Sequence, residues 1–191
     1  MKAMAHNIEI KASIESVSAI LPRVAALATS GPTEFDQDDT FFHCENGRLK
    51  LRTFSFESGE LIFYQRPDGA GPKESFYVIS PTSSPETLRQ ALSLAYGVVG
   101  RVRKHRTLFM VGRTRVHLDK VEGLGDFLEL EVVLAEGEPL TAGIAVANEL
   151  LGKLAITQSP LIDKAYVDMV PLNMSVSSAT STLSMEKTQW L

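Results

Sequence analysis

The chain has 191 residues, a length that fits one domain with a substantial core. Hydrophobic residues make up 44% of it and charged residues 22%, as in ordinary soluble globular proteins, and the net charge of −4 argues against a general nucleic-acid-binding protein. The one cysteine, Cys44, excludes an internal disulfide. Because no stretch is apolar enough for secretion or for a membrane span, we expect a soluble, cytoplasmic protein.

Alternation of polar and apolar residues recurs along most of the chain, so β structure should dominate. In chain order the pattern predicts a strand at 6–13, a helix at 14–29, strands at 37–44, 47–56, 60–67 and 75–81, a helix at 85–97, strands at 99–110, 111–121 and 126–135, a helix at 139–151 and a short helix near 160–167. Residues 1–171 would form the domain, and the Ser- and Thr-rich residues 172–191 a flexible tail.

Eight strands with many hairpins predict an α+β protein: an eight-stranded antiparallel closed β-barrel, or tunnel, with a charged lumen and helices packed outside. In one strand, alternating charge usually marks a solvent-exposed face. Here six strands follow the same rule, and helices would cover the apolar faces. The residues expected inside are Glu9, Lys11, Arg48, Lys50, Arg52, Tyr64, Arg66, Lys104, Arg106, Arg115, His117, Asp119, Glu129 and Glu131.

The seventh and eighth predicted strands carry the clearest chemical signal. Arg115, His117 and Asp119 share one face of the first, and Glu129 and Glu131 share one face of its hairpin partner. Carboxylates that face each other across a hairpin suit Mg²⁺ or Mn²⁺, which prefer oxygen ligands. Clustered Arg and Lys would neutralise an oligophosphate, and a divalent cation would bridge the carboxylates to its oxygens. The combination predicts a metal-dependent triphosphate enzyme.

Several segments in a fixed order also resemble a known family. They are Asn7-Ile-Glu-Ile-Lys11, Gly47-Arg-Leu-Lys-Leu-Arg52, Tyr64-Gln-Arg66, Val102-Arg-Lys-His-Arg106, Leu118 through Glu131, and Pro160-Leu-Ile-Asp-Lys-Ala-Tyr166. The chain resembles, over roughly residues 6–170, the CYTH superfamily of triphosphate tunnel metalloenzymes, which contains class IV adenylyl cyclases and thiamine triphosphatases. Its bacterial class IV cyclase-like branch is the most similar.

The resemblance implies a tunnel that binds a triphosphate with Mg²⁺ or Mn²⁺. It assigns metal binding to Glu9, Asp119, Glu129 and Glu131. It assigns phosphate binding to Lys11, Arg48, Lys50, Arg52, Arg66, Lys104, Arg106 and Arg115, and makes Lys11, Glu129 and Glu131 the candidate catalytic residues. Asn7 stands where the family pattern Glu-x-Glu-x-Lys has its first Glu, so a second metal should bind less tightly or not at all.

The leading hypothesis is a phosphohydrolase that cleaves inorganic, nucleoside or thiamine triphosphate with metal-activated water. One alternative is an adenylyl cyclase that forms cyclic AMP and pyrophosphate from ATP. Another, motivated by Asn7, is a protein that binds polyphosphate or an organic phosphate without turnover, and an enzyme acting on an organic diphosphate is also open. We expect a small-molecule ligand as the partner, neither nucleic acid nor membrane, and a possible homodimer.

Overall fold

The computed structural model describes residues 7–65, 73–156 and 161–170. It contains eight strands, whose bounds are β1 (Asn7–Ile14), β2 (Ser30–Phe42), β3 (Arg48–Ser55), β4 (Ser58–Gln65), β5 (Lys73–Thr82), β6 (Val98–Val111), β7 (Thr114–Val121) and β8 (Gly125–Val133). The helices are α1 (Val17–Leu27), α2 (Pro85–Tyr96), α3 (Leu140–Lys153) and the short 3₁₀ helix η1 (Tyr166–Asp168). The predicted α+β class is confirmed.

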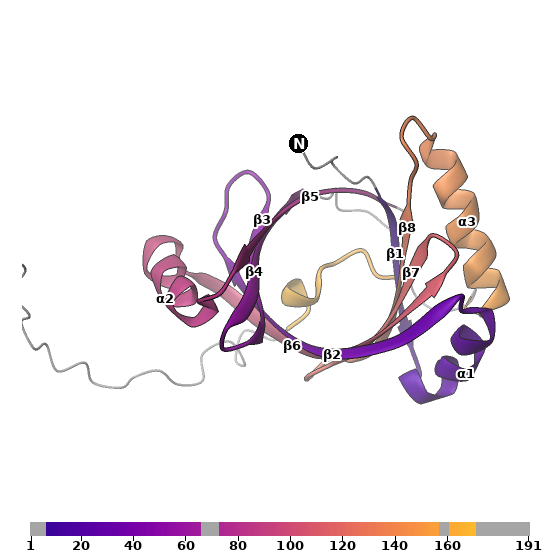
Figure 1. The fold of residues 1–191 in the computed structure, drawn as a ribbon, viewed down its shortest axis with the longest axis horizontal. Coiled ribbons are helices and arrows are strands. Elements are labelled where there is room, and N and C mark those ends of the chain that lie inside the picture. The colour runs from indigo at the N-terminus through magenta and orange to yellow at the C-terminus, as the bar shows by residue number, and fades with distance from the viewer. Residues whose placement is uncertain (1–6, 66–72, 157–160, 171–191) are drawn as a thin grey trace, which may run out of the picture.

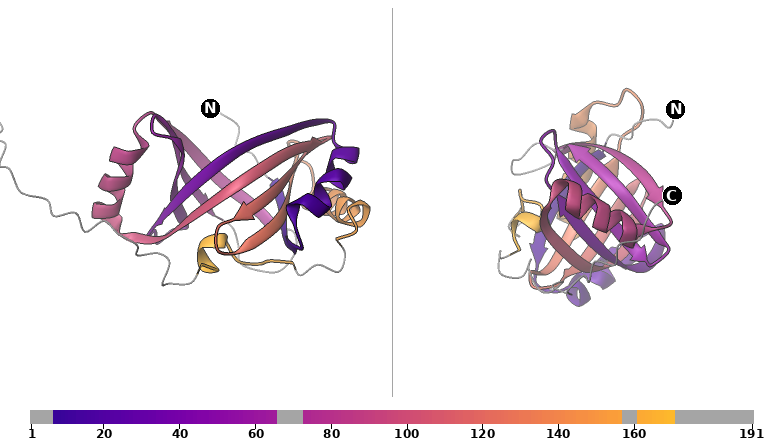
Figure 2. Two further views of the ribbon diagram at one scale, coloured as in Figure 1. Left: turned by 90° about the horizontal axis from the view of Figure 1, so that it is seen from below. Right: turned by 90° about the vertical axis from the view of Figure 1, so that its left-hand side faces the viewer.

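All the strand pairs are antiparallel, and their order is β1-β5-β4-β3-β2-β6-β7-β8. β1 pairs with β8 along eight residues and with β5 along three. Figure 1 looks along the space that the strands surround, with α2 on one side of the sheet and α1 and α3 on the other. Figure 2 shows the strands running obliquely between these helices.

The alternation in the sequence explains why α1 and α3 pack where they do. Ile8, Ile10 and Ala12 of β1 are almost fully buried, as are Val116 and Leu118 of β7 and Leu128, Leu130 and Val132 of β8. They form one core with residues of α1 and α3, so the apolar face of β1, β7 and β8 points away from the strand-enclosed space. The charged residues of these strands are thereby directed into that space.

Several predicted element boundaries differ from the structure, and of the short helix predicted near 160–167 the described residues contain only η1 (Tyr166–Asp168). β2 begins at Ser30 rather than 37, because its first half pairs with the long strand β6. α1 spans only Val17–Leu27, since β1 continues to Ile14 and the Ser16 hydroxyl then accepts a hydrogen bond from the Ala19 amide at 3.2 Å. The strand predicted from 111 begins at Thr114, because a turn at Gly112, with φ of 58°, precedes it.

The proposed domain end at 171 and the tail at 172–191 lie outside the described residues. Among the helices of the described part, none is long and apolar enough to cross a lipid bilayer.

Candidate functional site

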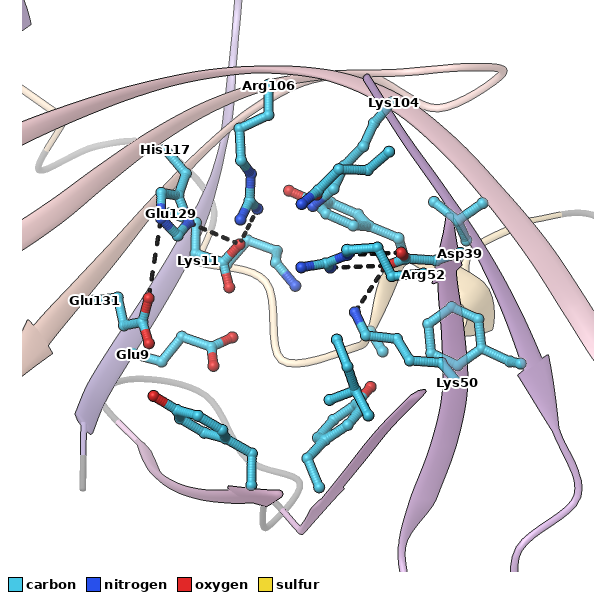
Figure 3. Close-up of a pocket in the computed structure, with 18 of the residues that line it drawn as sticks. Glu9, Lys11, Asp39, Lys50, Arg52, Lys104, Arg106, His117, Glu129 and Glu131 are labelled. Atoms are coloured by element: carbon cyan, nitrogen blue, oxygen red, sulfur yellow. Dashed lines mark hydrogen bonds and ion pairs between the residues drawn. The ribbon is translucent and has the colours of Figure 1, made fainter. Parts of the chain in front are cut away.

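A cavity of about 530 Å³ lies in the space that the strands surround, a size typical of small-molecule sites. Every strand contributes to its wall, together with the segment around η1 (Figure 3). The lining residues are Glu9, Lys11, Phe35, Gln37, Asp39, Phe41, Lys50, Arg52, Phe54, Ile62, Tyr64, Tyr77, Ile79, Val102, Lys104, Arg106, Arg115, His117, Glu129, Glu131, Ala165 and Tyr166.

The acidic part of the wall follows from the register of β1, β8 and β7. Glu9 and Glu131 are direct cross-strand partners, and Glu131 is also the partner of Arg115. In this register Arg115 Nη1 lies 2.9 Å from Glu131 Oε1. The neighbouring row joins Glu129 of β8 to His117 of β7. These rows bring carboxylates from two strands to one side of the cavity (Figure 3). The guanidinium of Arg115 joins them from a third strand.

A second charged cluster surrounds Asp119, whose side chain has no solvent exposure. Arg106 donates to it through Nε at 2.6 Å and Nη2 at 2.7 Å, and Lys104 Nζ donates at 2.9 Å. The Tyr166 hydroxyl also donates to Asp119, at 3.1 Å. Arg106 Nη2 further reaches Glu129 Oε2 at 2.9 Å, so this cluster is joined to the acidic wall.

A third cluster is built on β2 and β3. Asp39 accepts from Lys50 Nζ at 2.7 Å, and from Arg52 Nε and Nη2 at 2.8 Å each. The register explains these contacts, because Asp39 and Arg52 are direct partners and Lys50 is two residues away on the same face. Two buried carboxylates, Asp39 and Asp119, thus each hold a pair of cations.

Burial and the neighbouring charges shift the pKa values of several side chains in these clusters. Burial, reinforced by Arg52, lowers the pKa of Lys50 to about 7, and burial beside Arg106 lowers the pKa of Lys104 to about 8. Burial by itself would raise the pKa of Glu129. The charges of Lys11 and Arg106, with His117 nearby, outweigh it, so the pKa of Glu129 lies well below its usual range. Glu129 is therefore ionised at neutral pH.

His117 is mainly affected by burial, which, with the nearby Arg106 charge, lowers its pKa. Its ring nitrogens lie 3.8 Å from Glu129 and 3.9 Å from Glu131, so a neutral imidazole faces two carboxylates. His117 thus lines the cavity, as its position on the inner face of the predicted strand indicated.

Residues 5–166 match the CYTH domain family. The chain belongs to this family. It is 22% identical over 180 residues to a protein named adenylate cyclase CyaB from Aeromonas hydrophila, covering 90% of this chain and 92% of that relative. The solved structure of the PH1012 protein from Pyrococcus horikoshii OT3 is similar with a TM-score of 0.77 and 20% identity, covering 86% of this chain and 99% of that one. A conserved protein from Pyrococcus furiosus is similar at 0.74 and 19%, with the same coverage of 86% and 99%.

Most of the residues predicted to face the interior of this CYTH domain do line its cavity. They are Glu9, Lys11, Lys50, Arg52, Tyr64, Lys104, Arg106, Arg115, His117, Glu129 and Glu131. Their proposed roles in binding phosphate or metal stay predictions.

Two of the predicted site residues that the structure describes do not line the cavity. Arg48, at the first position of β3, donates instead to Asp168 of η1 at 2.7 and 2.9 Å, outside the cavity. Asp119 has the predicted orientation but lies behind the wall, with both oxygens engaged by cations, so it is poorly placed as a metal ligand. Arg66 lies outside the described residues.

The contribution of β2 and of the segment around η1 to the cavity wall was not predicted from the sequence. Phe35, Gln37, Asp39 and Phe41 alternate along β2 and all line the cavity. Their period of two was a usable signal, but the acidic residues that alternate with them, Glu34, Asp36 and Asp38, are also typical of a solvated strand. Tyr166 gave no comparable signal, because it reaches the cavity from a 3₁₀ helix after a long separation in sequence.

The carboxylates on β1 and β8 have the donor chemistry that Mg²⁺ and Mn²⁺ prefer. Within the described parts of the chain, no three acidic, histidine or cysteine side chains stand close enough to hold an ion by themselves. That arrangement still fits Mg²⁺, which commonly takes one or two protein carboxylates and completes its shell with water and substrate phosphates. Glu9, Glu129 and Glu131 are the residues that would hold it.

Asn7, the departure from the family pattern, lies beside this group. Its Nδ2 donates to Glu131 Oε1. Its side-chain oxygen is buried and has no hydrogen-bond partner among the described residues. A glutamate here would place a further negative charge beside Glu131, whereas the amide supplies a donor that holds it in place.

Proposed function

We propose that this CYTH protein is a Mg²⁺- or Mn²⁺-dependent phosphohydrolase that acts on a triphosphate bound in the cavity. One observation carries the proposal: cations and carboxylates line the same cavity and are already matched to one another. Arg115 is paired with Glu131, Arg106 with Glu129, and Lys50 with Asp39. A phosphate chain entering such a site brings several negative charges that the wall does not balance alone.

A divalent cation held by carboxylates among Glu9, Glu129 and Glu131 would offset this imbalance by adding positive charge next to the phosphates. The pairing of β1 with both β5 and β8 supports a closed barrel, in which the bound phosphates would be shielded from bulk water. In that setting the metal would supply charge neutralisation and activation of a water molecule.

The residues of the acidic wall have defined tasks in this proposal. Lys11, Arg106 and Arg115 hold the terminal phosphates, and Glu129 and Glu131 orient the attacking water, whose proton one of them accepts. Water attacks the terminal phosphorus, the bond from that phosphorus to the bridging oxygen breaks, and inorganic phosphate leaves the diphosphate product. The step requires no covalent enzyme intermediate.

Adenylyl cyclase activity is the second candidate, supported by the name of the Aeromonas hydrophila relative. In that reaction the 3′-hydroxyl of ATP attacks the α-phosphorus, and pyrophosphate leaves. The same cations would hold the phosphates, so the two reactions differ in which phosphorus meets the nucleophile.

The test is to incubate the purified chain with Mg²⁺ or Mn²⁺ and inorganic triphosphate, ATP or thiamine triphosphate, and to separate the products chromatographically. We expect phosphate release that EDTA and Glu129→Gln abolish. The matched control is Glu149→Gln on the surface of α3, where Glu149 pairs with Lys153, and it should retain activity. Cyclic AMP with pyrophosphate would establish the cyclase instead, and binding without turnover would refute both enzymatic proposals.

A further inference from the structure

The helix α2 packs against the sheet less completely than α1 and α3 do. α1 buries three of its residues and α3 buries four, whereas Pro85 alone is buried among the twelve described residues of α2. The end of α2 and the start of β6 instead carry exposed apolar side chains, those of Leu94, Tyr96, Val98 and Val99. We call these four residues the α2–β6 surface. None of them lines the strand-enclosed cavity.

The α2–β6 surface has the character of a binding surface. Single exposed apolar side chains are ordinary, but here four of them lie within residues 94–99, and Leu94 is 90% exposed. Residues 90–100 contain no charged side chain, so this part of the protein would not attract a strongly charged ligand. Figure 2 shows α2 at one end of the molecule and α1 and α3 at the other, so neither of these helices covers it.

A pocket of about 270 Å³ adjoins the α2–β6 surface. Part of its wall is apolar and comes from Phe42, Leu49, Val99 and Val167. The His43 amide, in the same wall, donates a hydrogen bond to the Gly97 carbonyl at 3.3 Å, which joins the pocket to the end of α2. The pocket therefore offers an apolar side chain a place at the edge of this surface.

The described chain ends beside the same pocket. Val167 of η1 packs so closely on Gly100 that a Cβ at that glycine would lie 2.8 Å from the valine side chain. Val170 is the last described residue, and its amide donates to the Tyr166 carbonyl at 3.2 Å. The residues that follow Val170 consequently leave the fold close to the start of β6.

The sequence beyond this point contains a segment that matches the α2–β6 surface. Residues 175–182 are mostly Ser and Thr, the composition of a linker. Residues 183–191 differ, because four of these nine are large and apolar, namely Leu183, Met185, Trp190 and Leu191. This segment has one acidic and one basic residue, so it carries no net charge, like the surface itself.

The linker is long enough to bring this segment onto α2. Extended, residues 171–182 would span roughly 40 Å, more than twice the length of roughly 18 Å expected for a twelve-residue helix such as α2. Attachment beside the surface also gives the segment a high effective concentration there, which favours it over a second copy of the chain.

We propose that residues 183–191 pack on the α2–β6 surface of the same chain, where Trp190 buries the largest apolar area. The expected flexible tail is then limited to the residues before 183. Because the surface lies outside the cavity, this contact does not depend on the proposed function.

Fluorescence of the full chain tests this contact, because Trp190 is its one tryptophan. Relative to the urea-unfolded chain, the native emission should be blue-shifted and less quenched by acrylamide. Leu94→Asp should return both readouts to the unfolded values while the circular dichroism of the fold persists, since so exposed a side chain stabilises little of the described core. The matched control is Leu140→Asp, at an exposed leucine of α3 on the other side of the sheet, and it should change neither readout.

Tyr96→Asp is a second variant in case Leu94→Asp folds poorly. Native emission equal to that of the unfolded chain, or protection of Trp190 that both variants leave unchanged, would overturn the proposal. Sedimentation velocity at two protein concentrations identifies the remaining occupant. Protection that grows with concentration together with a dimer would show that a second copy covers the surface, and would also overturn the proposal. Protection in a monomer that Leu94→Asp or Tyr96→Asp abolishes would establish it.

Discussion

The Asp119 cluster yields the sharpest stability prediction. Asp119→Asn keeps the shape of the side chain but removes the charge that Arg106 and Lys104 share at 2.6 to 2.9 Å. Because the carboxylate has no solvent exposure, Lys104 would lose a buried counter-ion, and Arg106 would keep its contact with Glu129 but lose its bidentate partner. Breaking a buried pair in this way costs about 3–5 kcal/mol of unfolding free energy, out of a typical total of about 5–15 kcal/mol.

For a domain of this size that loss corresponds to a fall in Tm of roughly 10 °C, measurable by differential scanning calorimetry. The matched control is Asp36→Asn, because Asp36 forms its ion pair with His105 while its side chain is 86% exposed, and it should shift Tm by less than about 2 °C. An Asp119→Asn variant whose Tm stays that close to the wild-type value would refute the reasoning that the cluster needs its buried charge.

The same variant should change the response of stability to acid. Burial would raise the pKa of Asp119, but Arg106 and Lys104 hold it below its usual range. An unfolded aspartate binds a proton near pH 3.9, so this group contributes fully above about pH 5 and its contribution is lost as the pH falls toward the folded pKa. Wild-type protein should therefore lose stability more steeply below about pH 4 than Asp119→Asn does, as followed by urea denaturation. Parallel acid profiles for the two proteins would contradict this assignment.

Three further predictions address the site and the packing. Arg115→Ala should weaken triphosphate binding at least about tenfold in calorimetry. Arg48→Ala, which removes an ion pair outside the cavity, should change the affinity less than about twofold. Equal losses of affinity in the two variants would place Arg48 at the ligand. Gly143→Ala should lower Tm, because a Cβ there would lie 2.6 Å from a leucine and 2.7 Å from an isoleucine side chain. Gly152→Ala meets nothing within 4 Å and should raise Tm. A higher Tm for Gly143→Ala than for Gly152→Ala would show that α3 adjusts freely. NMR titration of isotopically methylated lysines should find a pKa of about 7 for Lys50, because of its burial beside a guanidinium, and a value near 10 would contradict the buried geometry.

Much of the cavity lining could be predicted because the direction of a strand side chain is a local property of the backbone. Once β1, β3, β7 and β8 were recognised, a period of two placed Lys11, Arg52, His117 and Glu129 on one face. The apolar residues of the opposite face then required helices to cover them, and α1 and α3 do so in β1, β7 and β8. The helices themselves followed from their own periodicity.

The period of two does not predict how deeply a side chain is buried or which residue it pairs with. Asp119 and Glu129 belong to the same predicted inner face, yet only Glu129 lines the cavity. Arg48 obeys the same alternation as Arg52 but turns to Asp168, a residue of η1 that is 120 positions away in the sequence. Whether a side chain lines the cavity or pairs elsewhere depends on which strand ends contact the segment around η1 and on how far the side chain reaches.

The sequence by itself determined the antiparallel α+β class, the faces of most strands, and a charged interior with acids on the first and last strands. Tertiary structure decided which cations are matched to which carboxylates, and thereby that Asp39 is a counter-ion in the wall of the cavity. The physical reason is that alternation is set by each residue's own backbone. Ion pairing and exposure, in contrast, depend on register between strands that are distant in sequence and on the solvent that the whole fold excludes.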